Sequence, residues 1–147
     1  MIRNSAKAVI IEDGKVLLTK NIDAEGCFYL FPGGGQEQGE TLHEAVVREC
    51  IEELGEQVEA FDLLHIREYI GQNHEFAIHD ADVHQIEFYF ACRLLGRQVE
   101  ATQPDVHQTG IEWVPLAALE NYRVYPMAIR PVIAAQHKKL VYLGDVN

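Results

Sequence analysis

A cluster of acidic residues and a glycine-rich turn share the segment PGGGQEQGETLHEAVVRECIEELG, which runs from Pro32 to Gly55. On a helix, Glu49, Glu52 and Glu53 would share one face, because residues three and four apart are neighbours. Like charges at this spacing repel each other, whereas the hard cations Mg²⁺ and Mn²⁺ prefer carboxylate oxygens. The cluster therefore indicates a divalent metal site. The competing interpretation is an acidic helix face that only contacts water.

Local sequence predicts a helix that would position these carboxylates. Thr41 with Glu44 three residues later is a capping-box pattern, so the helix should begin near Leu42. Gly55 can take the left-handed conformation that ends a helix. The opposite face is apolar and can pack on a core; it comprises Val46, Val47, Cys50, Ile51 and Leu54.

The glycine turn at 33–35 excludes two other phosphate-binding interpretations. No Gly-Lys-Ser/Thr follows the glycines, as a P-loop would require. The Gly-x-Gly-x-x-Gly register of a dinucleotide-binding fold is also missing.

The spacing of these residues resembles the Nudix box, G-x5-E-x7-R-E-U-x-E-E-x-G-U, where U is a bulky apolar residue. All the fixed positions match: Gly34, Glu40, Arg48, Glu49, Glu52, Glu53 and Gly55. A chance match in a chain of this length is on the order of one in a million, given roughly 7% abundance for each residue type. Two variable positions depart from the pattern, since Cys50 is small and Glu56 replaces an apolar residue.

The resemblance implies an α/β fold, the Nudix α/β/α sandwich with a mixed β-sheet, and a single domain over residues 1–147. It implies hydrolysis of a nucleoside diphosphate linked to another group, with water as nucleophile and Mg²⁺ or Mn²⁺ as cofactor. The implied metal ligands are Glu49, Glu52, Glu53 and the carbonyl of Gly33. Lewis-acid metal ions neutralise phosphate oxygens and lower the pKa of bound water.

The other residues of the box have implied roles as well. Glu52 is also the candidate base, Glu53 acts with it, and Arg48 orients the glutamates through charge-assisted hydrogen bonds. Glu40 is expected in a supporting or outer metal role. Gly34 lets backbone groups approach the metal and the phosphate closely.

The identities of the general base and of the substrate stay open. Some family members use an acidic residue from a distant loop, and the candidates here are Asp80, Asp82, Glu87, Asp105, His107 and Glu112. Oxidised nucleoside triphosphates, ADP-ribose, nucleotide sugars and dinucleoside polyphosphates all remain possible substrates. A Nudix-like module that binds a nucleotide metabolite as a sensor, without hydrolysis, is the alternative function; such modules typically lose box glutamates, which are present here.

Length and charge narrow the partners. At 147 residues the chain is long enough for one domain with a substantial core. The formal net charge of −11 argues against nucleic acid as the main partner, since phosphate binding needs a basic surface. No long apolar run predicts a membrane span, and the N-terminus lacks a signal-peptide core, which indicates a cytoplasmic protein. Oligomeric state is open, a homodimer included.

The cysteines predict neither a disulfide nor a zinc site. The chain has 3 cysteines, an odd number without CxxC spacing. Structural disulfides and a cysteine zinc site are therefore not expected.

The remaining pattern predicts the elements around the box. Strands are expected over 6–12 and 16–19, joined by a hairpin at Asp13-Gly14, and over 26–31, 58–70, 84–95 and 110–115. A helical turn is expected over 116–120. A helix is expected over 127–139 with Ala128, Pro131, Val132 and Ala135 inward, or beginning only at Pro131.

The stretch 71–83 is polar and irregular, and the expectation is a loop. With His84 it holds His74, His79, Asp80 and Asp82. These side chains make a second metal site conceivable, but a solvated loop is the simpler interpretation. Long loops in compact domains are often functional.

Overall fold

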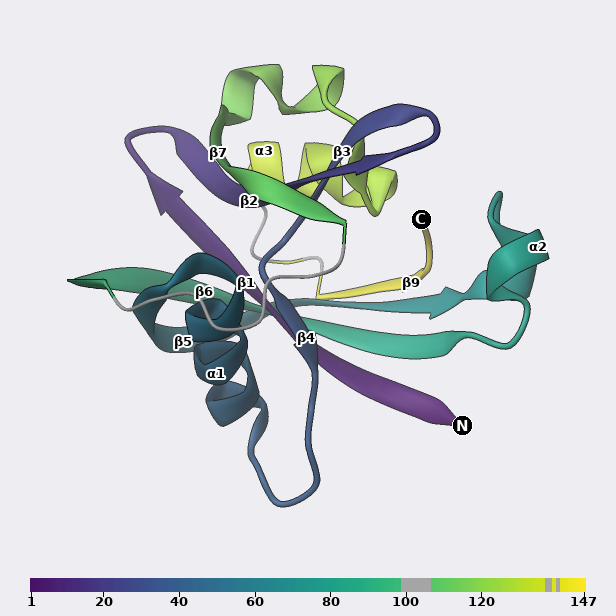
Figure 1. Ribbon diagram of the computed structural model, residues 1–147, viewed down its shortest axis with the longest axis horizontal. Coiled ribbons are helices and arrows are strands. Elements are labelled where there is room, and N and C mark those ends of the chain that lie inside the picture. Colours follow the sequence, from purple (N-terminus) through teal and green to yellow (C-terminus); the bar gives the residue numbers. More distant parts are fainter. Residues whose placement is uncertain (99–106, 137–138, 140) are drawn as a thin grey trace.

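The computed structural model describes residues 1–98, 107–136, 139 and 141–147 as an α/β fold (Figure 1). The chain begins with a hairpin of β1 (Ile2–Glu12) and β2 (Lys15–Asp23). Asp13 and Gly14 turn it with φ angles of 51° and 73°. Both angles suit a tight hairpin turn and the Asp-Gly pair that the sequence indicated.

The strands form a mixed sheet in the order β8-β3-β2-β1-β6-β5-β9, with β4 added to β1 and β7 added to β2. Strands β1 and β6 run parallel, whereas β5 and β6 run antiparallel. The remaining bounds are β3 Gly26–Leu30, β4 Gly33–Gly35, β5 Glu56–Ile70, β6 His84–Gln98, β7 Gln108–Pro115, β8 Val124–Tyr125 and β9 Tyr142–Asp145. The predicted α/β class with a mixed sheet is confirmed.

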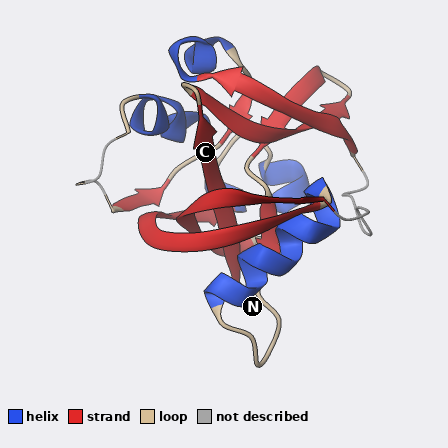
Figure 2. Ribbon diagram, turned by 90° about the vertical axis from the view of Figure 1, so that its left-hand side faces the viewer, coloured by secondary structure: helices blue, strands red, loops and turns tan. Residues whose placement is uncertain are grey.

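Helices cover the strands from two sides, as Figures 1 and 2 show. The long helix α1 (Leu42–Leu54) packs through Ala45, Val46 and Cys50 on a core that includes Ala6, Ala8, Ile10 and Phe90. The short helices on the other side pack on a second core, around Tyr89 and Phe31. They are η2 (Leu116–Asn121), η3 (Met127–Ile129) and α3 (Arg130–Ala134).

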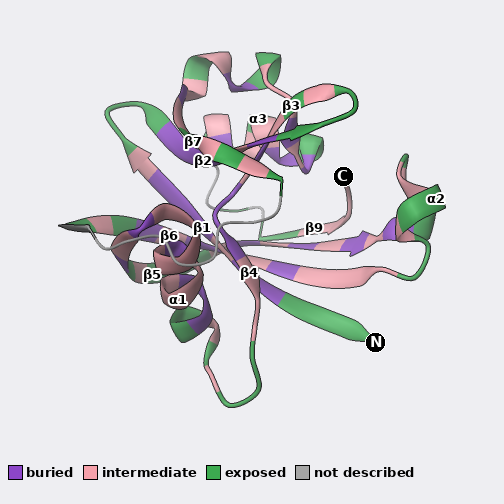
Figure 3. Ribbon diagram, viewed as in Figure 1, coloured by how far each residue is buried: buried purple, intermediate pink, exposed green. Residues whose placement is uncertain are grey.

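Buried residues run along the middle of the strands, whereas the N-terminal end of β1 and the small helix α2 (Ala77–Asp80) are exposed (Figure 3). Alternation along β1 sends Ala6 and Ala8 towards α1, and Ser5 and Lys7 to the opposite face. The two faces of this strand therefore serve different parts of the molecule.

Strand β4 is the structural link between the sheet and α1. Its glycines pair antiparallel with β1, Gly33 opposite Lys7 and Gly34 opposite Ala6. A Cβ added at Gly33 would lie 2.0 Å from the Ala6 carbonyl oxygen, and its φ of +141° is one that other residues rarely adopt. Only glycine lets the two backbones come this close.

Two expectations need correction. The helix predicted over 127–139 is shorter: η3 precedes α3, which ends at Ala134, and residues 137 and 138 lie outside the described residues. Pro131 sits in the first turn of α3, where its missing N–H costs nothing. Ile129 of η3 and Ile133 of α3 are buried. Of the predicted inner stripe, Val132 is partly buried against the same core, whereas Ala128, Pro131 and Ala135 are exposed.

The stretch 71–83 is not wholly irregular, because it contains η1 (Gly71–Asn73) and α2. Within the described part of the chain, no helix is long and apolar enough to span a membrane.

Candidate functional site

Capping fixes the register of α1 and so the direction of its acidic face. The Thr41 hydroxyl accepts from the Glu44 amide at 3.1 Å, and the Glu44 carboxylate accepts from the Thr41 amide at 3.0 Å. Gly55 ends the helix with φ 67° and donates to the Ile51 carbonyl at 3.0 Å. The predicted helix and both caps are confirmed. They place the acidic face of the helix beside β4.

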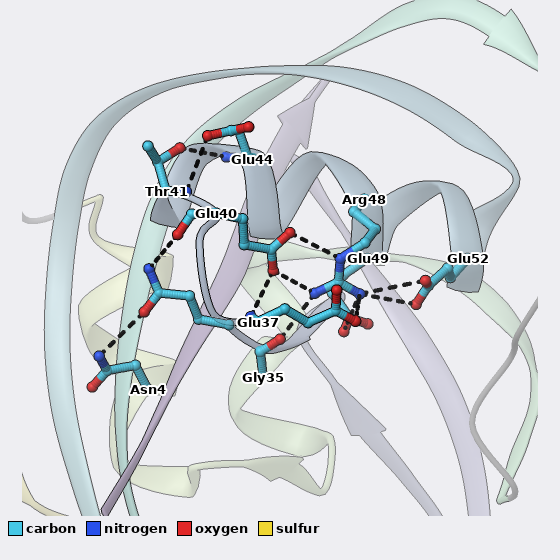
Figure 4. A network of polar contacts seen from close by, with 10 residues as sticks. Asn4, Gly35, Glu37, Glu40, Thr41, Glu44, Arg48, Glu49 and Glu52 are labelled. Carbon is cyan, nitrogen blue, oxygen red and sulfur yellow. Dashed lines mark hydrogen bonds and ion pairs between the residues drawn. The ribbon is translucent and has the colours of Figure 1, made fainter.

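Arg48 is the centre of the polar network on this face (Figure 4). Its Nε and Nη2 donate to the two oxygens of Glu40 at 3.1 and 2.7 Å. Nη1 donates to Glu49 at 3.1 Å and to Glu52 at 3.3 Å. Nη2 also donates to the Gly35 carbonyl at 3.0 Å. A guanidinium has five N–H donors, so these bonds engage all of them and leave Arg48 to orient the carboxylates.

Glu40 fastens the loop before the helix. Its Oε1 accepts from the Glu37 amide at 2.8 Å as well as from Arg48. The hydrogen bond from Arg48 lowers the pKa of Glu40 despite partial burial. Glu40 therefore stays ionised and holds Arg48 between the glycine turn and the helix.

Gly34 provides the space that Glu49 needs. A Cβ at Gly34 would lie 2.6 Å from Glu49 Oε1. The Glu49 side chain is only 15% exposed. Burial raises the pKa of Glu49, although Arg48 opposes the rise, and the charge of Glu52 adds to it. A nearby cation would relieve this buried, repelled carboxylate.

Glu53 and Lys7 meet at the other glycine of the turn. The Gly33 amide donates to Glu53 Oε2 at 2.8 Å. The Lys7 ammonium donates to the Gly33 carbonyl oxygen at 3.4 Å. The carbonyl predicted as a metal ligand thus lies beside a carboxylate and a lysine.

The residues present fit a divalent metal in kind. Carboxylates and a backbone carbonyl are the oxygen donors that Mg²⁺ and Mn²⁺ prefer. The space left by Gly34 admits the Glu49 carboxylate to the turn. Among the described residues, however, no group of three or more His, Cys, Asp or Glu side chains converges as a metal site. Glu49 and Glu52 are instead directed to Arg48, and Glu53 to Gly33.

A pocket of about 510 Å³ lies on the sheet face opposite α1. Its lining comes from β3, β5, β6, α2 and several more distant segments. The lining residues are Asp23, Phe28, Leu30, Arg67, Tyr69, Phe76, His79, Asp80, Val83, Gln85, Glu87, His107, Tyr125 and Asn147. Three of the candidate bases, Asp80, Glu87 and His107, therefore share one pocket.

Two of the other candidate bases, Asp82 and Glu112, lie elsewhere. Asp82 is exposed and does not line the pocket. Glu112 lies on β7, 4.0 Å from the Lys20 ammonium. Asp105 lies outside the described residues.

A buried ion pair forms the pocket floor. Arg67 Nε donates to Glu87 Oε1 at 2.8 Å, and the Tyr89 hydroxyl donates to the same oxygen at 2.5 Å. Burial on its own would raise the pKa of Glu87, but the positive charges of Arg67 and Lys7 outweigh it and lower the pKa. A carboxylate held ionised in this way is a weak base, which disfavours Glu87 as the general base.

Aromatic rings form the rim of the pocket. The Tyr125 ring packs edge-on against Phe28 and Phe76, with centroids 6.1 and 5.5 Å away. The Arg123 guanidinium lies 5.3 Å from the Phe28 and Tyr125 ring centroids and forms a bidentate pair with Asp23 at 2.9 Å. Such a rim can stack on a planar ring.

The helical turns over 71–80 are tied to β9 by a single carboxylate. Asp145 accepts from the Ile70 amide at 2.9 Å, from Asn73 Nδ2 at 2.9 Å and from His74 Nε2 at 2.6 Å. His84 instead bonds Glu68 at 3.1 Å. Two of the three histidines considered for a second metal site, His74 and His84, thus have separate partners.

A wider hollow of about 800 Å³ lies between α1 and strands β5 and β6. Aliphatic residues make up much of its lining, Val47, Ile51, Val58 and Leu95 among them. It offers fewer polar groups for fixing a ligand than the pocket on the opposite face.

Sequence reasoning missed Lys7, Arg67, Gln85 and Tyr125 as residues of the site. A signal was available for one of them. Lys7 is a charged residue inside the otherwise apolar run 6–11. A charge at such a position is buried only with a partner, so it marks a functional or paired site.

The protein has a mixed-sheet α/β fold in which the acidic face of a helix is held against a glycine turn. These two features define its structural class. The family model of the NUDIX domain matches residues 1–136. The chain belongs to the NUDIX family. The matched segment includes every residue of the box.

Two further comparisons support this assignment. The chain is 36% identical over 117 residues to "Nucleoside diphosphate-linked moiety X motif 6" of Xenopus laevis, covering 78% of this chain and 50% of that protein. Over 49 residues it is 55% identical to an ADP-ribose pyrophosphatase of Methanocaldococcus jannaschii, covering 32% of this chain and 28% of that one. The chain thus spans half or less of these relatives.

Solved structures show the same fold. A NUDIX hydrolase from Nitrosomonas europaea superposes with a TM-score of 0.75 at 20% identity, covering 97% of this chain and 94% of that chain. At this identity the likeness concerns the fold alone.

Proposed function

We propose that this protein hydrolyses a pyrophosphate bond in a nucleoside diphosphate linked to another moiety, with Mg²⁺ or Mn²⁺ as cofactor, and that residues 1–147 act as one domain. The observation that supports this most is the set of box glutamates held against Gly33–Gly35 by Arg48. An acidic helix face that only contacts water would need neither the arginine at its centre nor the space at Gly34.

Each box residue has a task in this proposal. Glu49, Glu52, Glu53 and the Gly33 carbonyl would hold the metal, which when bound supplies charge neutralisation and an acidified water. Arg48 positions Glu49 and Glu52, and Glu40 positions Arg48. Glu52, on the exposed side of the network, is the proposed base that accepts a proton from the attacking water. The glycines keep side chains out of the space where the phosphates would bind.

The pocket would bind the part of the substrate that does not react. Arg67 is paired with Glu87, so the charges that line the described pocket sum to acidic rather than basic. Aromatic rings and amides suit a neutral ring or sugar better than a further phosphate. Relatives named as ADP-ribose pyrophosphatase and nucleoside triphosphatase NudI match only 32% and 37% of this chain, so they support the reaction class more than a substrate.

A sensor that binds a nucleotide metabolite without hydrolysis is the second candidate. It is favoured only by the arrangement of Glu49 and Glu52 around Arg48 instead of around a common point. The complete box argues against it, because Glu52 and Glu53 would be dispensable in a module that only binds.

A substrate panel tests the proposal. ADP-ribose, nucleotide sugars, dinucleoside polyphosphates and ordinary and oxidised nucleoside triphosphates would be incubated with Mg²⁺ or Mn²⁺, and the products separated by chromatography. We expect a nucleoside monophosphate and a phosphorylated or pyrophosphate product from at least one compound, and none with chelator. Nucleotide binding without turnover across the panel would favour the sensor.

A further inference from the structure

Lys7 contacts the glycine turn and lies on the strand face that also carries Glu87 of the pocket. Across the strands β4, β1 and β6, Gly33 is opposite Lys7 and Lys7 is opposite Tyr89. Directly opposite residues share a face, so Lys7 lies on the same face as Tyr89 and Glu87. Of these two, Glu87 lines the pocket and the Tyr89 hydroxyl donates to it. Its ammonium nevertheless reaches the Gly33 carbonyl, whose own amide binds Glu53.

Two carboxylates feel the charge of Lys7 from opposite sides. The Lys7 ammonium acts to lower the pKa of Glu49 in the box and that of Glu87 in the pocket. A substrate with one end in the pocket and its pyrophosphate at the box would therefore pass this ammonium.

Three of the arginines around the site are already occupied. Arg48 uses its donors on Glu40, Glu49, Glu52 and Gly35. Arg67 binds Glu87 and the Val146 carbonyl, the latter at 2.6 Å. Arg123 binds Asp23 and Glu25. These three guanidinium groups are thus held by protein oxygens, whereas the Nη2 of Arg3 lies beside Gly35.

Lys7 differs from these arginines in its partners. Its hydrogen bond to Gly33 is long, at 3.4 Å, and the acceptor is a neutral carbonyl. An ammonium has three donors, and a half-buried one is stabilised by an anionic partner. The side chain has both the charge and the spare donors that a phosphate needs.

We propose that Lys7 binds a non-bridging phosphate oxygen of the substrate, on the phosphate next to the group held in the pocket. This inference rests on the proposed function. It assigns Lys7 to substrate binding and leaves Arg48 as a positioning residue. The alternative is a purely structural role, in which Lys7 only donates to the Gly33 carbonyl. Its charge would then affect stability and not phosphate binding.

Binding of a non-hydrolysable nucleotide separates these alternatives. The α,β-methylene analogues of ADP, GDP, CDP and UDP would be titrated calorimetrically in saturating Mn²⁺, and the tightest taken forward with its parent nucleoside. Lys7→Met would be compared with Lys7→Arg, which keeps the charge, and with Lys15→Met, which removes a lysine from the hairpin turn.

We expect Lys7→Met to lower the affinity for the diphosphate analogue about tenfold or more, because a charge-assisted hydrogen bond is lost. The nucleoside should bind Lys7→Met as it binds the wild type, Lys7→Arg should retain most of the affinity, and Lys15→Met should retain all of it. Melting temperatures show whether each variant is folded. If Lys7→Met does not fold, the affinity of Lys7→Arg for the analogue is the test.

Several results would overturn the proposal. These are equal affinity of Lys7→Met and wild type for the analogue, an equal loss for the nucleoside, no binding of any analogue by the wild type, or loss of the analogue by a folded Lys7→Arg equal to that of Lys7→Met. Because the analogue is not cleaved, absence of turnover in the substrate panel would leave this measurement intact.

Discussion

The box and the pocket are both built around an arginine among carboxylates, and they differ in charge balance. Arg48 faces Glu40, Glu49 and Glu52, and its side chain is 25% exposed. Arg67 faces Glu87 alone, with side chains 7% and 8% exposed. The first centre therefore keeps excess negative charge near solvent, whereas the second is neutralised and buried.

This difference indicates what each centre can bind. Excess carboxylate charge that a single arginine cannot neutralise attracts a cation. A one-to-one buried pair is a fixed polar floor, because breaking it would leave an unpaired charge. In the proposed function, reaction and recognition therefore belong to separate centres.

Among substitutions at the glycine turn and in the pocket, the largest effect should come from the neighbouring glycines Gly33 and Gly34. Gly34→Ala puts a Cβ 2.6 Å from the Glu49 carboxylate, the far end of a side chain, so the side chain must move while the backbone need not. We expect kcat to fall by about 10²-fold with melting temperature nearly unchanged, since displaced catalytic groups cost this much. Gly33→Ala puts its Cβ 2.0 Å from the Ala6 carbonyl instead, so that variant should lose stability itself.

Steady-state kinetics and thermal melts of both variants check this contrast. A normal kcat in Gly34→Ala would show that Glu49 takes no part in the reaction. Equal destabilisation by the two substitutions would mean that the space at Gly34 serves the fold only.

In the pocket, the expected effect is on affinity and not on chemistry. Phe28→Ala removes part of the aromatic rim, and Gln85→Ala removes an amide beside the floor. Each should raise KM by roughly tenfold with little change in kcat, since stacking or a hydrogen bond to the non-reacting group contributes about 1–2 kcal/mol. Gln72→Ala, exposed and away from the pocket, is the matched control. A fall in kcat at constant KM would place the pocket in the reacting centre.

The box could be predicted from sequence because its determinants are local. Thr41, Glu44 and Gly55 cap a helix within one short segment, and helical periodicity alone puts Glu49, Glu52 and Glu53 together. The Asp13-Gly14 hairpin is local in the same sense.

The pocket could not be predicted because distant strand pairing builds it. Arg67 meets Glu87 only through the register of β5 on β6, and Lys7 meets Tyr89 through the parallel pairing of β1 with β6. Local periodicity does not specify such registers. The misplaced inner stripe of the C-terminal helix has a local cause, because Pro131 set where α3 begins and so which side chains face inward.

The smallest effect concerns the link between β9 and the helical turns near the pocket. Burial would raise the pKa of Asp145, but hydrogen bonds from Asn73, His74 and the Ile70 amide lower it from 3.8 to about 2. A pKa that is lower in the folded than in the unfolded protein stabilises the fold at pH values above the unfolded-state pKa. This stability is lost as pH falls through the folded-state pKa of about 2.

Asp145→Asn should therefore cost about 1 kcal/mol near neutral pH, a figure reduced for partial exposure. The cost should shrink below pH of about 4. Urea unfolding of wild type and variant at several pH values measures it. A cost that is the same at neutral pH and at the lowest pH of the series would show that Asp145 acts through packing and not through its charge.

The central claim is that the acidic face of α1 performs the chemistry, and substitution at constant shape tests it most directly. Glu52→Gln and Glu53→Gln would be compared with Glu44→Gln, whose side chain caps the helix and can still accept a hydrogen bond as glutamine. With Mn²⁺ and the best substrate of the panel, we expect kcat to fall about 10²–10⁴-fold in the first two and to stay near normal in the third. Melts in chelator should show the first two at least as stable as the wild type, because a repelled charge has gone. Near-normal kcat in both Glu52→Gln and Glu53→Gln would contradict the account.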